Sequence, residues 1–147
     1  MSYAPTTEYE PSSFSRKMAR VLLVDDDPTS RLTLKTVLEA GGYSVDAAAS
    51  AAEAVLKLDQ GEYQLVLSDL QMESPEAGLK VIAHARNMDY KPATALIQAY
   101  HPDGPAWTAS SLLIAPEDLP GLLGKVADLI SMRATRRLNR ELLVAGA

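Results

Sequence analysis

The chain has 147 residues, 47% of them apolar, which suits one buried core and is short for two. Its net charge of −5 argues against nucleic acid or an anionic membrane as the main partner. The absence of cysteine excludes disulfides and zinc–thiolate sites, and no apolar run or N-terminal leader indicates a membrane span or secretion. We therefore expect a cytoplasmic protein with one folded domain.

The chain divides into three parts by composition. Residues 1–18 are rich in Ser, Thr, Pro and Tyr, and they are predicted to be a disordered N-terminal tail, or in part a tag or linker. Residues 19–131 carry the regular apolar patterns and should form the domain. Residues 132–147 are expected to extend the last helix and to end in a C-terminal tail.

The domain begins with a buried strand that runs into three aspartates, in the stretch VLLVDDDPTSR at residues 21–31. Asp27 followed by Pro28 is typical of a helix N-cap and first helical position. The helix should end at the glycine pair 41–42. Asp25 and Asp26 then remain at the carboxyl end of the strand.

The following segments alternate between strand and helix patterns. A weaker second strand is expected at 43–49, and a capping box at Ser50 to Glu53 opens a second helix. A third buried strand, QLVLSD, ends at Asp69, and a third helix is expected over 75–87. Strands four and five follow at 93–100 and 110–115, and a helix starts at Pro116.

This alternation predicts an α/β fold with a doubly wound parallel sheet. Ligands of such sheets bind beyond the carboxyl ends of the strands, so Asp25, Asp26 and Asp69 should converge there. Carboxylates grouped in this way suit Mg²⁺, and a carboxylate beside that ion can act as a nucleophile toward a phosphoryl group. For Asp27 the helix cap is the favoured interpretation.

With VLLVDDDPTSR and LVLSDLQM, the chain resembles the receiver domain of two-component response regulators from about residue 20 to residue 130. The resemblance implies a flavodoxin-like, five-stranded sheet of order 2-1-3-4-5. It also implies that Asp25 and Asp26 bind Mg²⁺ together with Asp69 and the main-chain carbonyl of Gln71. Asp69 would be the phospho-acceptor, and a histidine kinase would be the phosphate donor.

Several positions depart from the receiver pattern. Gln98 stands where receivers have a switch Thr or Ser, and Ala115 stands in place of their Lys. Glu73 and Glu76 add charge after Asp69 that would oppose a phosphoryl dianion. The segment between the fourth and fifth strands is too short and too rich in proline for a normal helix, so we expect the fourth helix of the family to be shortened or missing.

Together these residues predict an atypical, stand-alone receiver that signals through protein–protein contacts and is not an enzyme. Its partner would be a histidine kinase or a phosphate-independent signalling protein. The alternative is a haloacid-dehalogenase-type phosphatase, in which Asp25 would be the nucleophile and Asp27 the general acid. That family needs a lysine where Ala115 stands, which makes this alternative the weaker one.

The remaining features concern partner contacts. Trp107 would either plug the core or anchor a partner. Leucines at 138, 142 and 143, with arginines at 133, 136, 137 and 140, indicate a solvated last helix, a homodimer contact or a docking site. His84 and His101 are expected to be surface residues without a specific role.

Overall fold

The computed structural model describes residues 18–69, 72–74, 76–97, 113–114 and 119–146. Within these ranges strands and helices follow one another along the chain. The strands are β1 (Arg20–Val24), β2 (Ser44–Ala48), β3 (Leu65–Asp69), β4 (Ala93–Ile97) and β5 (Leu113–Ile114). The helices are α3 (Pro28–Ala40), α4 (Ala51–Gln60), α5 (Ala77–Arg86) and α6 (Leu119–Gly146).

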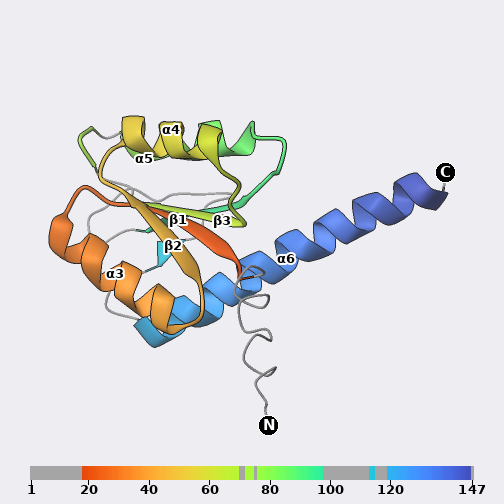
Figure 1. Cartoon of the computed structure of the whole chain (residues 1–147), viewed down its shortest axis with the longest axis horizontal. Helices are drawn as coiled ribbons and strands as arrows, with labels where there is room; N and C mark the ends of the chain where they lie inside the picture. Colours follow the sequence, from red (N-terminus) through yellow and green to blue (C-terminus); the bar gives the residue numbers. More distant parts are fainter. Residues whose placement is uncertain (1–17, 70–71, 75, 98–112, 115–118, 147) are drawn as a thin grey trace, which may run out of the picture.

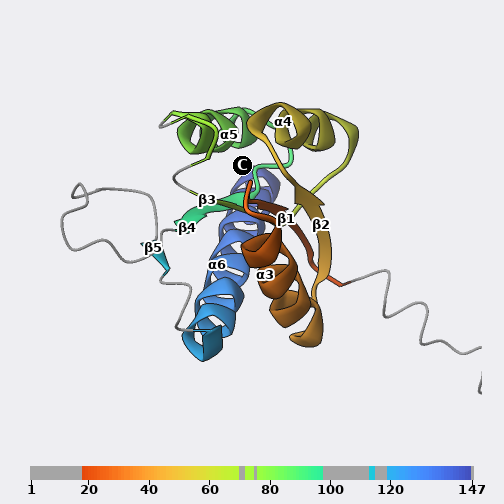
Figure 2. The same ribbon diagram turned by 90° about the vertical axis from the view of Figure 1, so that its left-hand side faces the viewer.

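The strands form one parallel sheet of order β2-β1-β3-β4-β5. Helices α4 and α5 cover one face of the sheet, and α3 and α6 cover the other (Figures 1 and 2). The α/β class and the strand order expected from the sequence are thereby confirmed. Because all the strands run in the same direction, their carboxyl ends meet at a single edge, as ligand sites of such sheets require.

A separate apolar core lies on each side of the sheet. Side chains alternate along each strand, so residues of β1 contribute to both cores. One core is shared with α3 and α6, and it includes Val21, Leu23, Leu34, Leu38, Leu122 and Val126. The other is shared with α4 and α5, and it includes Leu22, Val24, Leu58, Val66 and Val81. Burial on both sides explains why β1 and β3 are almost continuously apolar in sequence.

The local signals for helix ends operate as expected. The side chain of Asp27 accepts a hydrogen bond from the N–H of Ser30, which caps α3. Gly42 follows that helix with φ of +100°, a conformation that L side chains rarely adopt. Ser50 caps α4 by accepting from the N–H of Glu53. The third predicted helix is shorter than expected, because α5 occupies only Ala77–Arg86.

Helix α6 extends well beyond the body of the domain (Figure 1). Arg133 was predicted to belong to a basic cluster on this helix, but it is only 6% exposed. Its guanidinium donates to the main-chain oxygens of Lys91, at 2.9 Å from Nε, and of Tyr90, at 2.7 Å from Nη2. Arg133 therefore joins α6 to the loop between α5 and β4, and the exposed arginines are those at 136, 137 and 140.

Some sequence predictions concern residues outside the described ranges. These are the N-terminal tail through residue 17, the expected loss of the helix before β5, the main-chain carbonyl of Gln71, and the side chains of Gln98, His101, Trp107 and Ala115. In the part of the chain that the structure describes, no helix combines the length and apolarity needed to cross a membrane.

Candidate metal centre

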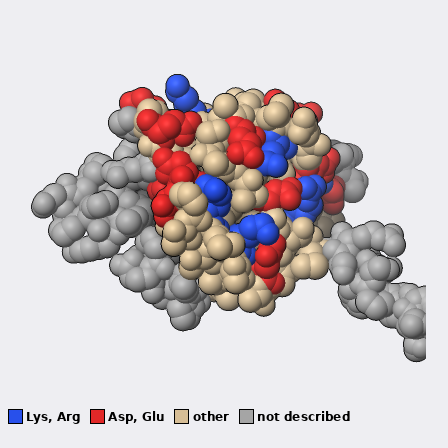
Figure 3. All heavy atoms as spheres, turned by 60° about the vertical axis from the view of Figure 1, so that its left-hand side comes forward, with Lys and Arg blue, Asp and Glu red and all other residues tan. Residues whose placement is uncertain are grey.

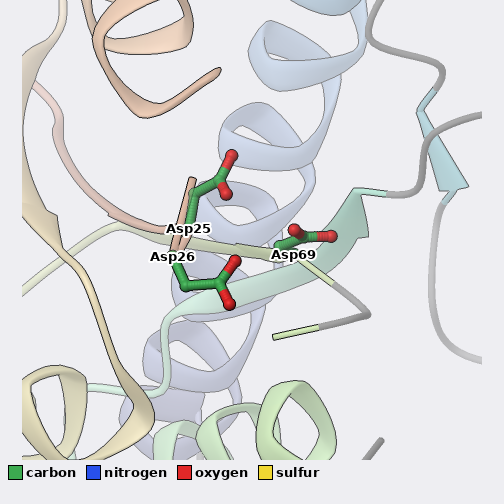
Figure 4. A group of neighbouring side chains, drawn as sticks. All are labelled: Asp25, Asp26 and Asp69. Atoms are coloured by element: carbon green, nitrogen blue, oxygen red, sulfur yellow. The ribbon is translucent and has the colours of Figure 1, made fainter. Parts of the chain in front are cut away.

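Three aspartates meet at the carboxyl edge of the sheet. Asp25 and Asp26 directly follow β1, and Asp69 is the last residue of β3. These strands are neighbours with Val24 paired to Ser68, so the aspartates lie side by side (Figure 4). One carboxylate oxygen from each of the three lies within 4.8 Å of the other two. The structure thus brings together the three side chains that the sequence pattern predicted to converge.

Three hydrogen bonds hold Asp25 in place. Its own N–H donates to the carbonyl of Ala48 at 3.0 Å, and its Oδ1 accepts from the N–H of Asp27 at 2.9 Å. The Arg31 guanidinium donates to the main-chain oxygen of Asp25 at 2.8 Å. Hydrogen bonds therefore fix the N–H, the carbonyl and the carboxylate of Asp25 at the start of the loop after β1.

The electrostatics of neighbouring aspartates differ. Burial, above all, raises the pKa of Asp25, and the charges of Asp27 and Asp26 add to that effect. Hydrogen bonds from the Asp27 N–H and with Asp69 only partly offset it. By contrast, the Ser30 N–H lowers the pKa of Asp27. An ionised Asp25 is thus costly without a counter-charge, whereas Asp27 is satisfied by its helix.

The chemistry of the donor set fits a hard divalent cation. Three carboxylates supply the oxygen ligands that Mg²⁺ prefers, and that ion usually keeps several waters and binds few protein groups. Asp25 is buried, Asp69 is half-buried and Asp26 is exposed. The group therefore has a buried side at Asp25 and a side open to solvent at Asp26.

The loop after Asp69 contains a contact that sequence reasoning missed. Oε2 of Glu73 accepts from the main-chain N–H of Ala51 at 3.1 Å, at the first residue of α4. The sequence predicts that the charge of Glu73 opposes a phosphoryl group, and the structure shows in addition that this carboxylate accepts a hydrogen bond at the N-terminus of α4. Glu73 and Ala51 are 22 positions apart, and no local sequence pattern predicts a contact between them.

One face of the molecule carries charges of both signs. On the face shown in Figure 3, Asp and Glu side chains alternate with Lys and Arg, and no continuous basic patch is visible. His84, expected to have no specific partner, has Nε2 at 2.8 Å from Oδ1 of Asp59. This pair links α5 to α4, so the residue has a structural contact.

Comparison with known proteins gives a single family. Residues 21–106 match the response regulator receiver domain. A gliding motility regulatory protein of Myxococcus xanthus is 38% identical over 69% of this chain and 12% of its own length. The transcriptional regulatory protein GlrR of Escherichia coli is 34% identical over 88% of this chain and 31% of its own length. The chain thus spans less than a third of each of these relatives.

Solved structures agree with this result. The response regulator TrrA of Thermotoga maritima, in complex with Mg²⁺ and BeF, is 33% identical. The match has a TM-score of 0.65 and covers 76% of this chain and 99% of that one. A receiver protein of Sinorhizobium medicae has a TM-score of 0.69 at 24% identity, over 80% of this chain and 98% of its own, and shows the shared fold.

Proposed function

The chain belongs to the response regulator receiver family, and from this membership we propose that Asp69 accepts a phosphoryl group beside a Mg²⁺ site formed by Asp25 and Asp26. The observation that carries the proposal is the group of three carboxylates with oxygens within 4.8 Å of one another. The relative TrrA was solved with Mg²⁺ and BeF, which supports the same ligand chemistry for this chain.

Each aspartate has a separate part in the proposed reaction. Asp25 and Asp26, with Asp69 and the main-chain carbonyl of Gln71, would hold Mg²⁺, which supplies positive charge for phosphoryl oxygens. A carboxylate oxygen of Asp69 forms a bond to phosphorus while the bond from phosphorus to the donor breaks. The leaving group departs with the electron pair of that bond.

We further propose that the response to phosphorylation is atypical. Gln98 and Ala115 occupy the positions of the switch hydroxyl and the lysine in the family pattern. An amide is a longer donor than a hydroxyl, and a methyl group supplies no charge. Signal output would then depend less on phosphate, and the module would act through contacts with a histidine kinase or with a phosphate-independent protein partner.

The last helix is the proposed contact for a second copy of the chain. Residues 19–131 would be the receiver, and residues 132–147 the extension that carries this contact. Leu138 and Leu142 are 55% and 60% exposed and lie one turn apart on the same face of α6. Leu142 follows Arg133 by about two and a half turns, so this face points away from the side that binds the domain.

A phosphatase that uses Asp25 and Asp27 is not favoured. Such a mechanism needs both carboxylates at the reacting phosphorus. The side chain of Asp27 instead caps α3 through Ser30 and does not belong to the group formed by Asp25, Asp26 and Asp69. We propose a signalling module rather than a hydrolytic enzyme.

Titration calorimetry with Mg²⁺, followed by beryllofluoride as a phosphoryl mimic, tests this function. Wild-type protein should bind Mg²⁺, and beryllofluoride only when Mg²⁺ is present. Asp26→Asn should weaken Mg²⁺ binding, and Asp69→Asn should abolish the beryllofluoride signal. Binding of beryllofluoride by Asp69→Asn as strong as by wild type would reject Asp69 as the acceptor.

A further inference from the structure

One hydrogen bond at the candidate metal centre joins a side chain of α3 to the main chain of a proposed ligand. Nη1 of Arg31 donates to the main-chain oxygen of Asp25 at 2.8 Å. The N–H of Arg31 also donates to the carbonyl of Asp27 at 2.9 Å. Main chain and side chain of Arg31 are thus both bound to the loop after β1, which connects the first turn of α3 to the aspartates.

The oxygen that accepts from Arg31 has few other donors available. Asp25 is only 4% exposed, so water reaches it poorly. A buried main-chain oxygen that loses its donor is destabilised, and its peptide group then tends to turn toward water or another donor. A guanidinium is a strong donor because it is always charged. Arg31 therefore favours one orientation of this peptide group.

The peptide group bound by Arg31 links two of the three aspartates. It consists of the carbonyl of Asp25 and the N–H of Asp26, and a peptide group is planar. Its orientation therefore sets the direction in which the chain enters Asp26. Asp26 is exposed, so the packing that surrounds Asp25 is not available to hold it. The place of its carboxylate beside that of Asp69 depends on the main chain (Figure 4).

From this geometry we propose that Arg31 is a positioning residue, which holds the peptide group between Asp25 and Asp26 so that both carboxylates are directed at one Mg²⁺ ion. The inference rests on the proposed function, because it concerns the same Mg²⁺ site. It opposes the expectation from charge alone. A guanidinium near the site repels a second cation, so on that ground removal of Arg31 would strengthen Mg²⁺ binding.

Two substitutions and a control separate the hydrogen bond from the charge. Arg31→Met removes both and keeps an unbranched side chain, whereas Arg31→Lys keeps the charge and a donor. Lys35→Met is the matched control, because Lys35 lies one turn further along the same side of α3 and binds Oε2 of Glu39 at 2.7 Å. The readouts are the Mg²⁺ dissociation constant and, in metal-free protein, the carbonyl ¹³C chemical shift of Asp25.

Arg31→Met should move the Asp25 carbonyl resonance to lower frequency, because the carbonyl loses a hydrogen bond. It should also weaken Mg²⁺ binding by about tenfold, the lower end of the range for residues that orient a metal ligand. Arg31→Lys should bind Mg²⁺ more tightly than Arg31→Met. Lys35→Met should differ from wild type by about twofold or less, because solvent and salt screen its charge.

Mg²⁺ binding by folded Arg31→Met that is as tight as in wild type, or tighter, would overturn the proposal, as would an unchanged Asp25 carbonyl shift. A role of Arg31 in folding alone would lower the unfolding temperature and leave the Mg²⁺ dissociation constant of the folded protein unchanged, so it gives the first of these results. Failure of wild-type protein to bind Mg²⁺ would instead reject the proposed function. The carbonyl shift needs no metal and still decides whether Arg31 holds the peptide group.

Discussion

The main-chain N–H of Asp27 donates to Oδ1 of Asp25 at 2.9 Å, while the side chain of Asp27 caps α3. One aspartate thus orients its neighbour's carboxylate and starts a helix at the same time. This division of roles explains three adjacent carboxylates: Asp27 is held by the fold, and the charges of Asp25 and Asp26 remain available for a ligand.

Asparagine at position 25 should have opposite effects on stability without and with Mg²⁺. Burial raises the pKa of Asp25 above its usual 3.8, so in metal-free protein the ionised carboxylate opposes folding. This penalty is absent at low pH and develops as the pH rises from 3.8 through the raised pKa. Asp25→Asn keeps an acceptor for the Asp27 N–H and should be more stable than wild type at neutral pH without metal.

With saturating Mg²⁺, wild-type protein should become more stable than Asp25→Asn. The variant is expected to bind the ion about tenfold or more weakly, so the ion stabilises it less. Thermal unfolding of both proteins with EDTA and with Mg²⁺ measures this reversal. Asp27→Ala is the control: it should be less stable than wild type in both conditions, since it loses the helix cap while its main-chain N–H can still donate to Asp25. If Mg²⁺ leaves the difference in unfolding temperature between Asp25→Asn and wild type unchanged, the assignment of Asp25 as a ligand is contradicted.

Alanine at position 133 should lower the free energy of unfolding by about 2 kcal/mol, because two carbonyls in the α5–β4 loop lose a charged donor. Lys91 in that loop has φ of +43°, which the guanidinium helps to maintain. Urea unfolding is the measurement. Arg140→Ala removes an exposed arginine from the same helix and should change stability by less than about 0.5 kcal/mol. Equal effects of the two substitutions would argue against the anchoring role of Arg133.

Tyr63→Phe should lower the free energy of unfolding by about 1 kcal/mol. The reason is that the hydroxyl of Tyr63 donates a hydrogen bond to Oδ2 of Asp46 at 2.8 Å, and phenylalanine has no such donor. Burial alone would raise the pKa of Asp46, but hydrogen bonds from Tyr63 and Arg20 overcome this effect and lower it. The stabilisation is therefore present above the ordinary pKa of 3.8 and is lost as the pH falls through the lower folded value. Denaturant unfolding between pH 7 and pH 2.5 should show the difference between Tyr63→Phe and wild type shrinking only at the acid end.

The double substitution Leu138→Lys with Leu142→Lys should dissociate a dimer formed through α6. Both leucines are exposed on the face opposite Arg133, and four lysines in one interface would repel one another. Sedimentation velocity should show wild-type dimer and variant monomer. Leu32→Lys replaces a leucine on α3 that is 66% exposed and should remain dimeric. If wild-type protein sediments as a monomer, the proposed contact between two copies of α6 is rejected.

The sequence was most informative where local rules apply. Buried strands, the Asp27 cap and the glycine ends of helices depend on residues close together in the chain, and the parallel topology then places Asp25 next to Asp69. Contacts between distant main-chain and side-chain groups could not be predicted. Arg133 binds carbonyls 42 and 43 positions away, so its sequence neighbours suggested a solvated basic cluster. Glu73 likewise has its acceptor role only because α4 begins beside the loop.

The central claim is that Asp69 accepts a phosphoryl group with the help of a cation held by Asp25 and Asp26. Intact mass spectrometry after incubation with phosphoramidate or acetyl phosphate measures this directly, with Mg²⁺ or EDTA, for wild type and Asp69→Asn. The account predicts a gain of one phosphoryl group in wild type with Mg²⁺, and no gain with EDTA or in Asp69→Asn. No gain by folded wild-type protein that binds Mg²⁺, or an equal gain by Asp69→Asn, would contradict it.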